Sequence, residues 1–253
     1  MSNSTKRFSE RVENYLKYRP DYPSFLIKVL ENELNFKKDF ILADIGSGTG
    51  ILSKLFLDYG NQVFCVEPNN EMRSAADNIL SEYANYQSIN GTAEETTLET
   101  DSIDLIVAGQ SYHWFNNSKA KKEFKRILKP NLSTVLIWNS RKKDNNEFSS
   151  EYESLINNFS IDYKQVGHYN INDHDLNSFF NKEGYKKVVL ENHQILDYDG
   201  LKGRLFSSSY MPNQNEKIAK TIMVKLKEIY NHHQKDGTIS IDYNTEIFIG
   251  KIH

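Results

Sequence analysis

The sequence predicts a doubly wound α/β fold with a seven-stranded, mostly parallel sheet and helices on both faces. Three observations predict it. A buried strand turns through three glycines into an amphipathic helix in residues 41–60. Apolar runs of strand length then alternate with helix-patterned segments up to residue 140. Finally, residues 238–252 alternate apolar and polar side chains, as a long final strand would.

The glycine-rich turn is the best-defined local feature. Residues 41–50 read ILADIGSGTG, and Gly60 follows where a helix C-terminal glycine belongs. Glycine suits such a turn because it adopts positive φ and lets a ligand approach the backbone without a Cβ atom in the way. The stretch therefore predicts a ligand-binding strand, loop and helix.

The spacing of Gly46, Gly48 and Gly50 narrows the class of ligand that the loop is expected to bind. It reads G-x-G-x-G, whereas a dinucleotide-binding loop reads G-x-G-x-x-G, and the chain has no G-x-x-x-x-G-K-[ST] phosphate loop. Asp44 places a negative charge beside the turn, which would repel a pyrophosphate but attract an ammonium group. These features disfavour NAD and favour a ligand with an amino-acid end.

A second marker follows in the next strand, Val63 to Val66. This strand ends in Glu67, roughly 20 residues beyond the loop, where a carboxylate can accept hydrogen bonds from both hydroxyls of a ribose. Pro68 and Asn69 then end the strand. The alternative interpretation is a solvated glutamate at a strand end.

Length and charge favour one domain and disfavour a nucleic-acid partner. The 253 residues suit one large domain, and the net charge of −3 gives no electrostatic reason to expect a nucleic-acid partner. The densest basic runs, residues 119–129 and 141–143, are interpreted as a solvated helix face and a loop. We expect a small-molecule partner rather than a nucleic acid.

The same analysis predicts a cytoplasmic protein without a membrane segment. The N-terminus lacks the apolar core of a signal peptide, and no apolar stretch approaches the ~20 residues that span a bilayer. The single cysteine, Cys65, lies in a predicted buried strand and is interpreted as a small core residue. The histidines lack a convincing metal-ligand spacing, so no metal site is expected, and His232 and His233 are expected to be exposed.

The remaining elements follow from periodicity and from helix-breaking residues. A first helix, residues 8–19, ends before Pro20 and Pro23. Further helices are expected at residues 24–35, 51–59, 70–80, 117–128, 147–159, 173–180, 201–206 and 216–230. Strands are expected at residues 41–45, 63–66, 86–89, 102–108, 134–138, 186–196 and 238–252.

Five motifs in order carry a resemblance to a known family. They are Asp44 to Gly50 (DIGSGTG), Val66 to Asn69 (VEPN) with Met72, Gly91 to Glu94 (GTAE), Ser102 to Val107 (SIDLIV), and Ile127 to Pro130 (ILKP). The chain resembles the class I S-adenosylmethionine-dependent methyltransferases, in the small-molecule branch called methyltransferase type 11, over residues 8–140. The resemblance implies a single Rossmann-like domain with cap helices in residues 1–36, a cofactor-binding core in 37–140, and substrate-covering helices and C-terminal strands in 141–253. It also implies that the last strand is antiparallel and that these helices cover the active site.

The resemblance also assigns residues to the cofactor. It implies that Ala93 and Glu94 face the adenine, and that Tyr18 and Arg19 approach the methionine part. The alternative is a surface helix whose tyrosines pack on the sheet edge. The full set of expected cofactor-binding residues is Tyr18, Arg19, Asp44, Gly46, Ser47, Gly48, Gly50, Glu67, Pro68, Met72, Ala93, Glu94 and Gln110.

The substrate is expected to meet the cofactor beyond the fourth strand, in residues 109–115. This segment lacks the Asn/Asp-Pro-Pro-Tyr/Phe sequence of methyltransferases that act on amines of bases or on glutamine. His113 is a candidate general base, because an imidazole pKa near 6.5 suits that role; the alternative is that His113 only orients the loop. Tyr15, His113, Trp114 and Tyr210 are the candidate substrate-binding residues.

The predicted function is methyl transfer from S-adenosylmethionine to an organic acid, hydroxyl or thiol of a metabolite, which leaves S-adenosylhomocysteine. We expect a monomer or homodimer. The alternatives are a methyltransferase that acts on a macromolecule and a non-catalytic protein that binds S-adenosylmethionine. A nicotinamide dehydrogenase is a more distant alternative, which the glycine spacing disfavours.

Overall fold

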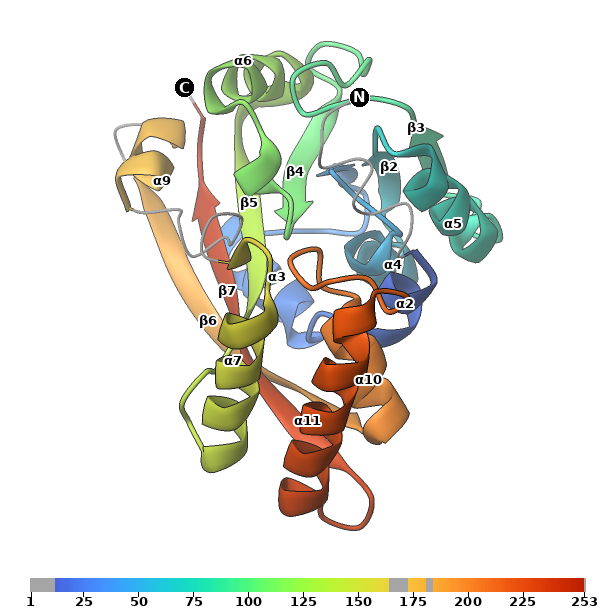
Figure 1. Cartoon of the computed structure of the whole chain (residues 1–253). Coiled ribbons are helices and arrows are strands. Elements are labelled where there is room, and N and C mark those ends of the chain that lie inside the picture. The colour runs from blue at the N-terminus through green and yellow to red at the C-terminus, as the bar shows by residue number, and fades with distance from the viewer. Residues whose placement is uncertain (1–11, 164–172, 181–183, 253) are drawn as a thin grey trace.

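One seven-stranded mixed sheet forms the centre of the protein (Figure 1). The computed structural model describes residues 12–163, 173–180 and 184–252. Strand order is β3-β2-β1-β4-β5-β7-β6, and β7 alone runs antiparallel to its neighbours. The predicted fold class is therefore confirmed. The strands are β1 (Ile41–Ile45), β2 (Gln62–Val66), β3 (Tyr86–Ile89), β4 (Ile103–Gly109), β5 (Leu128–Arg141), β6 (Tyr185–Leu196) and β7 (Ile239–Gly250).

Helices bury both faces of the sheet. In β4, Leu105 and Val107 pack into one hydrophobic cluster with α3 and α4, while Ile106 and Ala108 pack into another with α6 and α9. Side chains on a strand alternate between faces, so two covered faces require the continuous apolar run seen in β4. The helices are α2 (Val12–Tyr18), α3 (Phe25–Leu34), α4 (Ile51–Tyr59), α5 (Asn70–Leu80), α6 (Asn117–Ile127), α7 (Glu147–Phe159), α9 (Asp173–Phe179), α10 (Tyr198–Phe206) and α11 (Lys217–His233).

Two long strands carry a helical cap. β7 pairs with β5 only from Gly250 back to Tyr243, whereas its pairing with β6 continues to Ile239. The β6–β7 ribbon therefore extends past the carboxyl end of β5, and α7, α10 and α11 pack on this extension in a third hydrophobic cluster (Figure 1). The predicted helical cover thus lies beyond the carboxyl ends of the parallel strands.

The end of β5 corrects one expectation. The sequence predicts a strand at 134–138 and a solvated loop at 141–143, yet β5 continues to Arg141, which is only 8% exposed. Arg141 is buried because it pairs with Tyr243 of the β7 extension and forms an ion pair with Glu153 of α7. The first part of the expected N-terminal helix, residues 8–11, lies outside the described residues. Among the helices that are described, none has the length and apolar character needed to cross a membrane.

Candidate functional site

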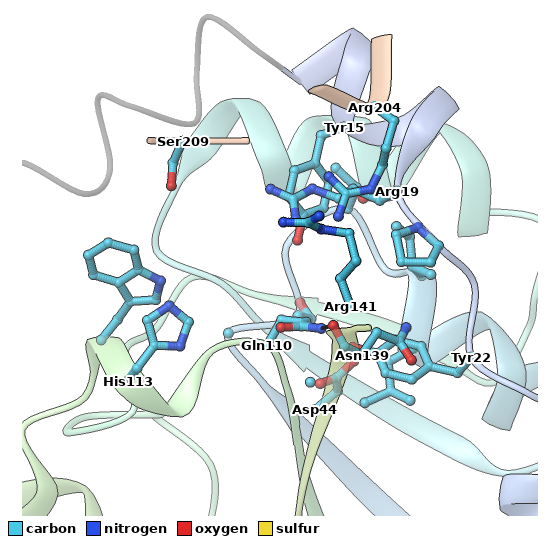
Figure 2. Close-up of a pocket in the computed structure, with 18 of the residues that line it drawn as sticks. Tyr15, Arg19, Tyr22, Asp44, Gln110, His113, Asn139, Arg141, Arg204 and Ser209 are labelled. Atoms are coloured by element: carbon cyan, nitrogen blue, oxygen red, sulfur yellow. Dashed lines mark hydrogen bonds between the residues drawn. The ribbon is translucent and has the colours of Figure 1, made fainter. Parts of the chain in front are cut away.

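A pocket lies at the carboxyl ends of β1, β4 and β5, beneath the cap (Figure 2). In open α/β sheets ligands bind at this edge. Residues from the N-terminal helix, the glycine-rich loop, the strand ends and the cap all contribute to its wall. They are Tyr15, Arg19, Pro20, Tyr22, Asp44, Gly46, Ser47, Thr49, Ile51, Leu52, Gly109, Gln110, His113, Trp114, Asn139, Arg141, Tyr163, Arg204, Ser209 and Tyr210.

The glycine-rich loop has the backbone that its sequence predicts. Gly46, Gly48 and Gly50 have φ angles of 68°, 58° and 81°, in the region that favours glycine. A Cβ atom on Gly46 would lie 2.6 Å from Ser111, but a Cβ atom on Gly48 would meet nothing within 4 Å. Close packing therefore explains Gly46, whereas the backbone at Gly48 faces open space that a ligand can use.

Glu67 supports this loop. Its carboxylate accepts hydrogen bonds from the backbone N–H of Gly48 at 2.9 Å and of Asn69 at 2.8 Å. Burial raises the pKa of the Glu67 carboxyl above its ordinary value. Each carboxylate oxygen accepts more than one hydrogen bond, so both oxygens keep capacity for a ligand. The ribose-binding role of Glu67 stays a prediction.

Asp44 is the most unusual group in the pocket. Its Oδ2 accepts a hydrogen bond from Ser53 at 2.6 Å, while the buried Oδ1 has no hydrogen-bond partner within the described part of the chain. Burial raises the pKa of the Asp44 carboxyl to about 7. The buried hydroxyls of Ser47 and Thr49 likewise lack partners among the described residues. Buried polar groups are normally paired, so these three groups fit the polar amino-acid end of a ligand, with Asp44 facing its ammonium.

The end of β4 contributes a strained turn and two aromatic rings. Gln110 has a φ of 58°, and its backbone N–H donates a hydrogen bond to Ile137 at 2.9 Å. Non-glycine residues in this conformation cluster at functional sites. The short helix η1 (Tyr112–Trp114) then directs His113 and Trp114 to the pocket, with their ring centroids 4.8 Å apart.

The structure brings together nine of the residues expected from the sequence. Those that line the pocket are Tyr15, Arg19, Asp44, Gly46, Ser47, Gln110, His113, Trp114 and Tyr210. Tyr18 instead packs on α10, where a Cβ atom on Gly203 would lie 2.1 Å from its ring.

The other expected cofactor residues lie outside the lining of this pocket, and their roles stay predictions. Glu94 accepts a hydrogen bond from the backbone N–H of Asn116 at 2.7 Å. Asn69 accepts one from the N–H of Met72 at 2.8 Å and so caps α5. The residues outside the lining are Tyr18, Gly48, Gly50, Glu67, Pro68, Met72, Ala93 and Glu94.

Sequence reasoning missed two arginines in the wall, Arg141 and Arg204. Arg204 lies on α10, where its Nε donates to the Tyr243 hydroxyl at 3.0 Å and its Nη1 donates to the Ser208 hydroxyl at 3.1 Å. A local signal for Arg204 exists, because it lies three residues after Leu201 and therefore on the apolar side of its helix. Arg141 has no such signal within its own segment.

A small polar group lies elsewhere, between α7 and α11. One ligand atom from each of Glu147, His232 and His233 lies within 4.8 Å of the others. His233 is partly buried and also lies 3.1 Å from Glu151, so it is not simply exposed as the sequence suggested. Two of the three residues are exposed, and none of them lines the pocket.

Comparisons with known proteins find similarity to methyltransferases. Residues 43–135 match a family described as a methyltransferase domain. An uncharacterized methyltransferase from Schizosaccharomyces pombe is 32% identical over 137 residues, which is 54% of this chain and 53% of that protein. The chain therefore aligns with about half the length of this curated relative.

Solved structures share the whole fold. A protein from Anaeromyxobacter dehalogenans, provisionally assigned as a type II methyltransferase, has a TM-score of 0.70 at 17% identity, covering 93% of this chain and 98% of that one. Phosphoethanolamine N-methyltransferase 2 from Haemonchus contortus, in complex with phosphomonomethylethanolamine and S-adenosylhomocysteine, has a TM-score of 0.60 at 16% identity, covering 99% of this chain and 59% of that one. Together, the glycine-rich loop, the sheet order and the matched residues 43–135 support a class I S-adenosylmethionine-dependent methyltransferase.

Proposed function

We propose that this protein transfers a methyl group from S-adenosylmethionine to a small-molecule acceptor, an organic acid or a metabolite with a hydroxyl or thiol, and releases S-adenosylhomocysteine. The observation that carries the proposal is the buried Oδ1 of Asp44, which has no hydrogen-bond partner among the described residues, together with the open space at Gly48 in a matched methyltransferase domain. The net charge of −3 supports a small acceptor over a nucleic acid. We expect the protein to act in the cytoplasm.

The chain's own residues would bind and orient the cofactor. Asp44 and Ser47 suit its ammonium and carboxylate end, and Arg19 suits the carboxylate. Glu67 suits the ribose hydroxyls, and Glu94 suits the amino group of adenine. When bound, S-adenosylmethionine supplies a methyl group already activated by the positive sulfonium. The protein's task is then to align the acceptor with that methyl group and to exclude water.

The cap supports a small acceptor. Tyr163, Arg204, Ser209 and Tyr210 of the cap region face the strand ends across the pocket, so an acceptor would react beneath these side chains. A macromolecule would have to insert one group below the cap. His113 lines the same space, and we propose that it accepts the proton of a hydroxyl or thiol acceptor, whereas an ionised carboxylate needs no base.

Calorimetric titration with S-adenosylmethionine, S-adenosylhomocysteine and NAD in parallel tests the proposal. We expect micromolar dissociation constants for the first two and no binding of NAD. Binding of NAD alone would contradict the cofactor assignment. Turnover is then measured as S-adenosylhomocysteine release with a panel of metabolite acceptors. Cofactor binding without release on any acceptor would favour the non-catalytic alternative, and release only with nucleic acid or protein would favour the macromolecular one.

A further inference from the structure

Three arginines from distant parts of the chain converge in the pocket. Arg19 follows α2, Arg141 ends β5, and Arg204 lies on α10, yet their guanidinium groups lie together beside Tyr15 (Figure 2). Arg141 and Arg204 are only 8% and 7% exposed. A guanidinium stays charged in a protein, and burying a charge is costly unless it is paired.

The protein neutralises only part of this charge. Arg141 forms an ion pair with Glu153, but Glu153 also has Lys143 at 3.5 Å. Among the described residues, Arg204 donates only to hydroxyl groups, and Arg19 donates to the backbone carbonyl of Ser207 at 3.0 Å. Within the described residues, neither Arg19 nor Arg204 has a carboxylate at ion-pair distance.

Donor atoms also remain free. Nε of Arg19 and Nη1 of Arg141 are buried and have no hydrogen-bond partner in the described part of the chain. A buried donor without an acceptor costs about 1 to 3 kcal/mol, more when it is charged. The pocket therefore holds unused, charged donors that face a ligand-sized space.

Neighbouring groups respond to the positive field. Burial alone would raise the pKa of the Tyr210 phenol, yet that pKa is lowered, because Arg204 and Arg141 stabilise the phenolate. Burial and the charge of Arg204 together lower the pKa of Arg19. Both effects indicate that the cluster is close enough for its charges to act on one another.

The cofactor cannot balance this cluster. S-adenosylmethionine has one carboxylate but also an ammonium and a sulfonium, so its binding adds net positive charge. If its carboxylate pairs with Arg19, then Arg204 still has no carboxylate partner among the described residues, and Arg141 shares Glu153 with Lys143. The acceptor is the remaining molecule of the reaction, so the missing negative charge must come from it.

We propose that the methyl acceptor is a small organic anion whose carboxylate or phosphate oxygens are held by Arg141 and Arg204. This inference rests on the proposed function and names its substrate class. The planar guanidinium matches both oxyanions through paired N–H donors, which an ammonium cannot reproduce. Arg141 comes from the sheet and Arg204 from the cap, so the anion would also join the two parts of the site.

The experiment is calorimetric titration of the protein saturated with S-adenosylhomocysteine. The probes are succinate, citrate, inorganic phosphate and the neutral diamide of succinate. We expect at least one oxyanion to bind and the diamide not to bind. Arg141→Gln and Arg204→Gln should each weaken that binding about ten- to a hundredfold, while Arg204→Lys retains part of it.

Matched controls distinguish the loss of a charged contact in the pocket from a general effect on folding. Arg126→Gln also removes a guanidinium paired with a glutamate, Glu123, but outside the pocket, and it should leave anion binding unchanged. Each variant should keep the wild-type affinity for S-adenosylhomocysteine within about twofold, since neither Arg141 nor Arg204 is assigned to the cofactor.

The outcomes separate this inference from the proposed function. Binding of S-adenosylhomocysteine without binding of any oxyanion would overturn the anionic acceptor and leave the methyltransferase proposal standing. Equal binding of succinate and its diamide would also overturn it. Absence of cofactor binding would instead refute the proposed function. Preference for phosphate over both carboxylates, or the reverse, supports the site and identifies the oxyanion.

Discussion

Asp44→Asn removes one buried charge at nearly constant volume, and the structure predicts that it stabilises the free protein. The asparagine keeps an oxygen that can accept the hydrogen bond from Ser53. Burial raises the pKa of Asp44 from 3.8 to about 7. At about 1.36 kcal/mol per pKa unit, ionised Asp44 lowers the free energy of unfolding by on the order of 4 kcal/mol in the absence of ligand.

The pH dependence has a definite sign. The folded protein holds the Asp44 proton more tightly than the unfolded chain does. Below the unfolded pKa, Asp44 is protonated in both states, and its full contribution to stability is present. It is lost as pH rises through about 7. Asp44→Asn should therefore exceed the wild type by on the order of 4 kcal/mol near pH 8 and by less than about 1 kcal/mol near pH 4. Urea unfolding followed by tryptophan fluorescence measures both.

Cofactor binding should depend on pH in the opposite direction, with affinity rising as pH rises. The ammonium pairs with the ionised carboxylate, so wild-type affinity for S-adenosylmethionine should rise about tenfold per pH unit up to about pH 7, and Asp44→Asn should lack this slope. Asp58→Asn, on the exposed surface of α4, is the control: it removes an exposed ion pair with Lys54, so it should not stabilise the protein and should leave the pH dependence of cofactor binding unchanged. Parallel stability curves for wild type and Asp44→Asn, or an affinity independent of pH in the wild type, would refute the reasoning.

Three further substitutions test the loop and the cap. Gly48→Val should abolish cofactor binding and lower stability by about 1 to 3 kcal/mol. Gly237→Val is the control, because Gly237 has a similar φ of 75° and equally open surroundings; it should lower stability by the same amount and leave cofactor binding unchanged. Calorimetry measures the binding, and thermal melting measures the stability. Glu67→Gln should weaken cofactor binding by about 1 to 3 kcal/mol, and an unchanged dissociation constant would remove the ribose assignment. Gly203→Ala places a Cβ atom 2.1 Å from the Tyr18 ring. It should therefore displace α2 and weaken binding of both the cofactor and the anionic acceptor. Wild-type affinities in that variant would show that the position of α2 does not matter.

The cofactor half of the site could be predicted because its signals are local. The turn at residues 46–50 follows from glycine spacing, and the strands on either side follow from short apolar runs. Each element needs only its own residues and the order of parallel strands to reach the carboxyl edge of the sheet. The structure confirms β1, β2 and α4 within about one residue of the expected bounds.

The orientation of single side chains was harder to predict. The sequence places Tyr15 and Tyr18 within one turn of a helix and suggests that they point the same way. Positions three apart on a helix differ in direction by about 60°. That difference is enough for Tyr15 to line the pocket while Tyr18 packs against Gly203.

In the acceptor half, the burial of Arg141 could not be predicted, because the partners that cover its charge come from other elements of the chain. Arg141 begins a basic run that favours a solvated loop, and residues of other elements cover it, among them Tyr243 of β7 and Glu153 of α7. Arg204, by contrast, breaks the apolar stripe that Leu201 and Leu205 form on α10. A buried arginine without a carboxylate destabilises the free protein, so a hydrophobic residue there would give a more stable cap. Residues that destabilise the free protein are expected at binding sites. The buried Arg204 therefore supports a site for an anionic acceptor.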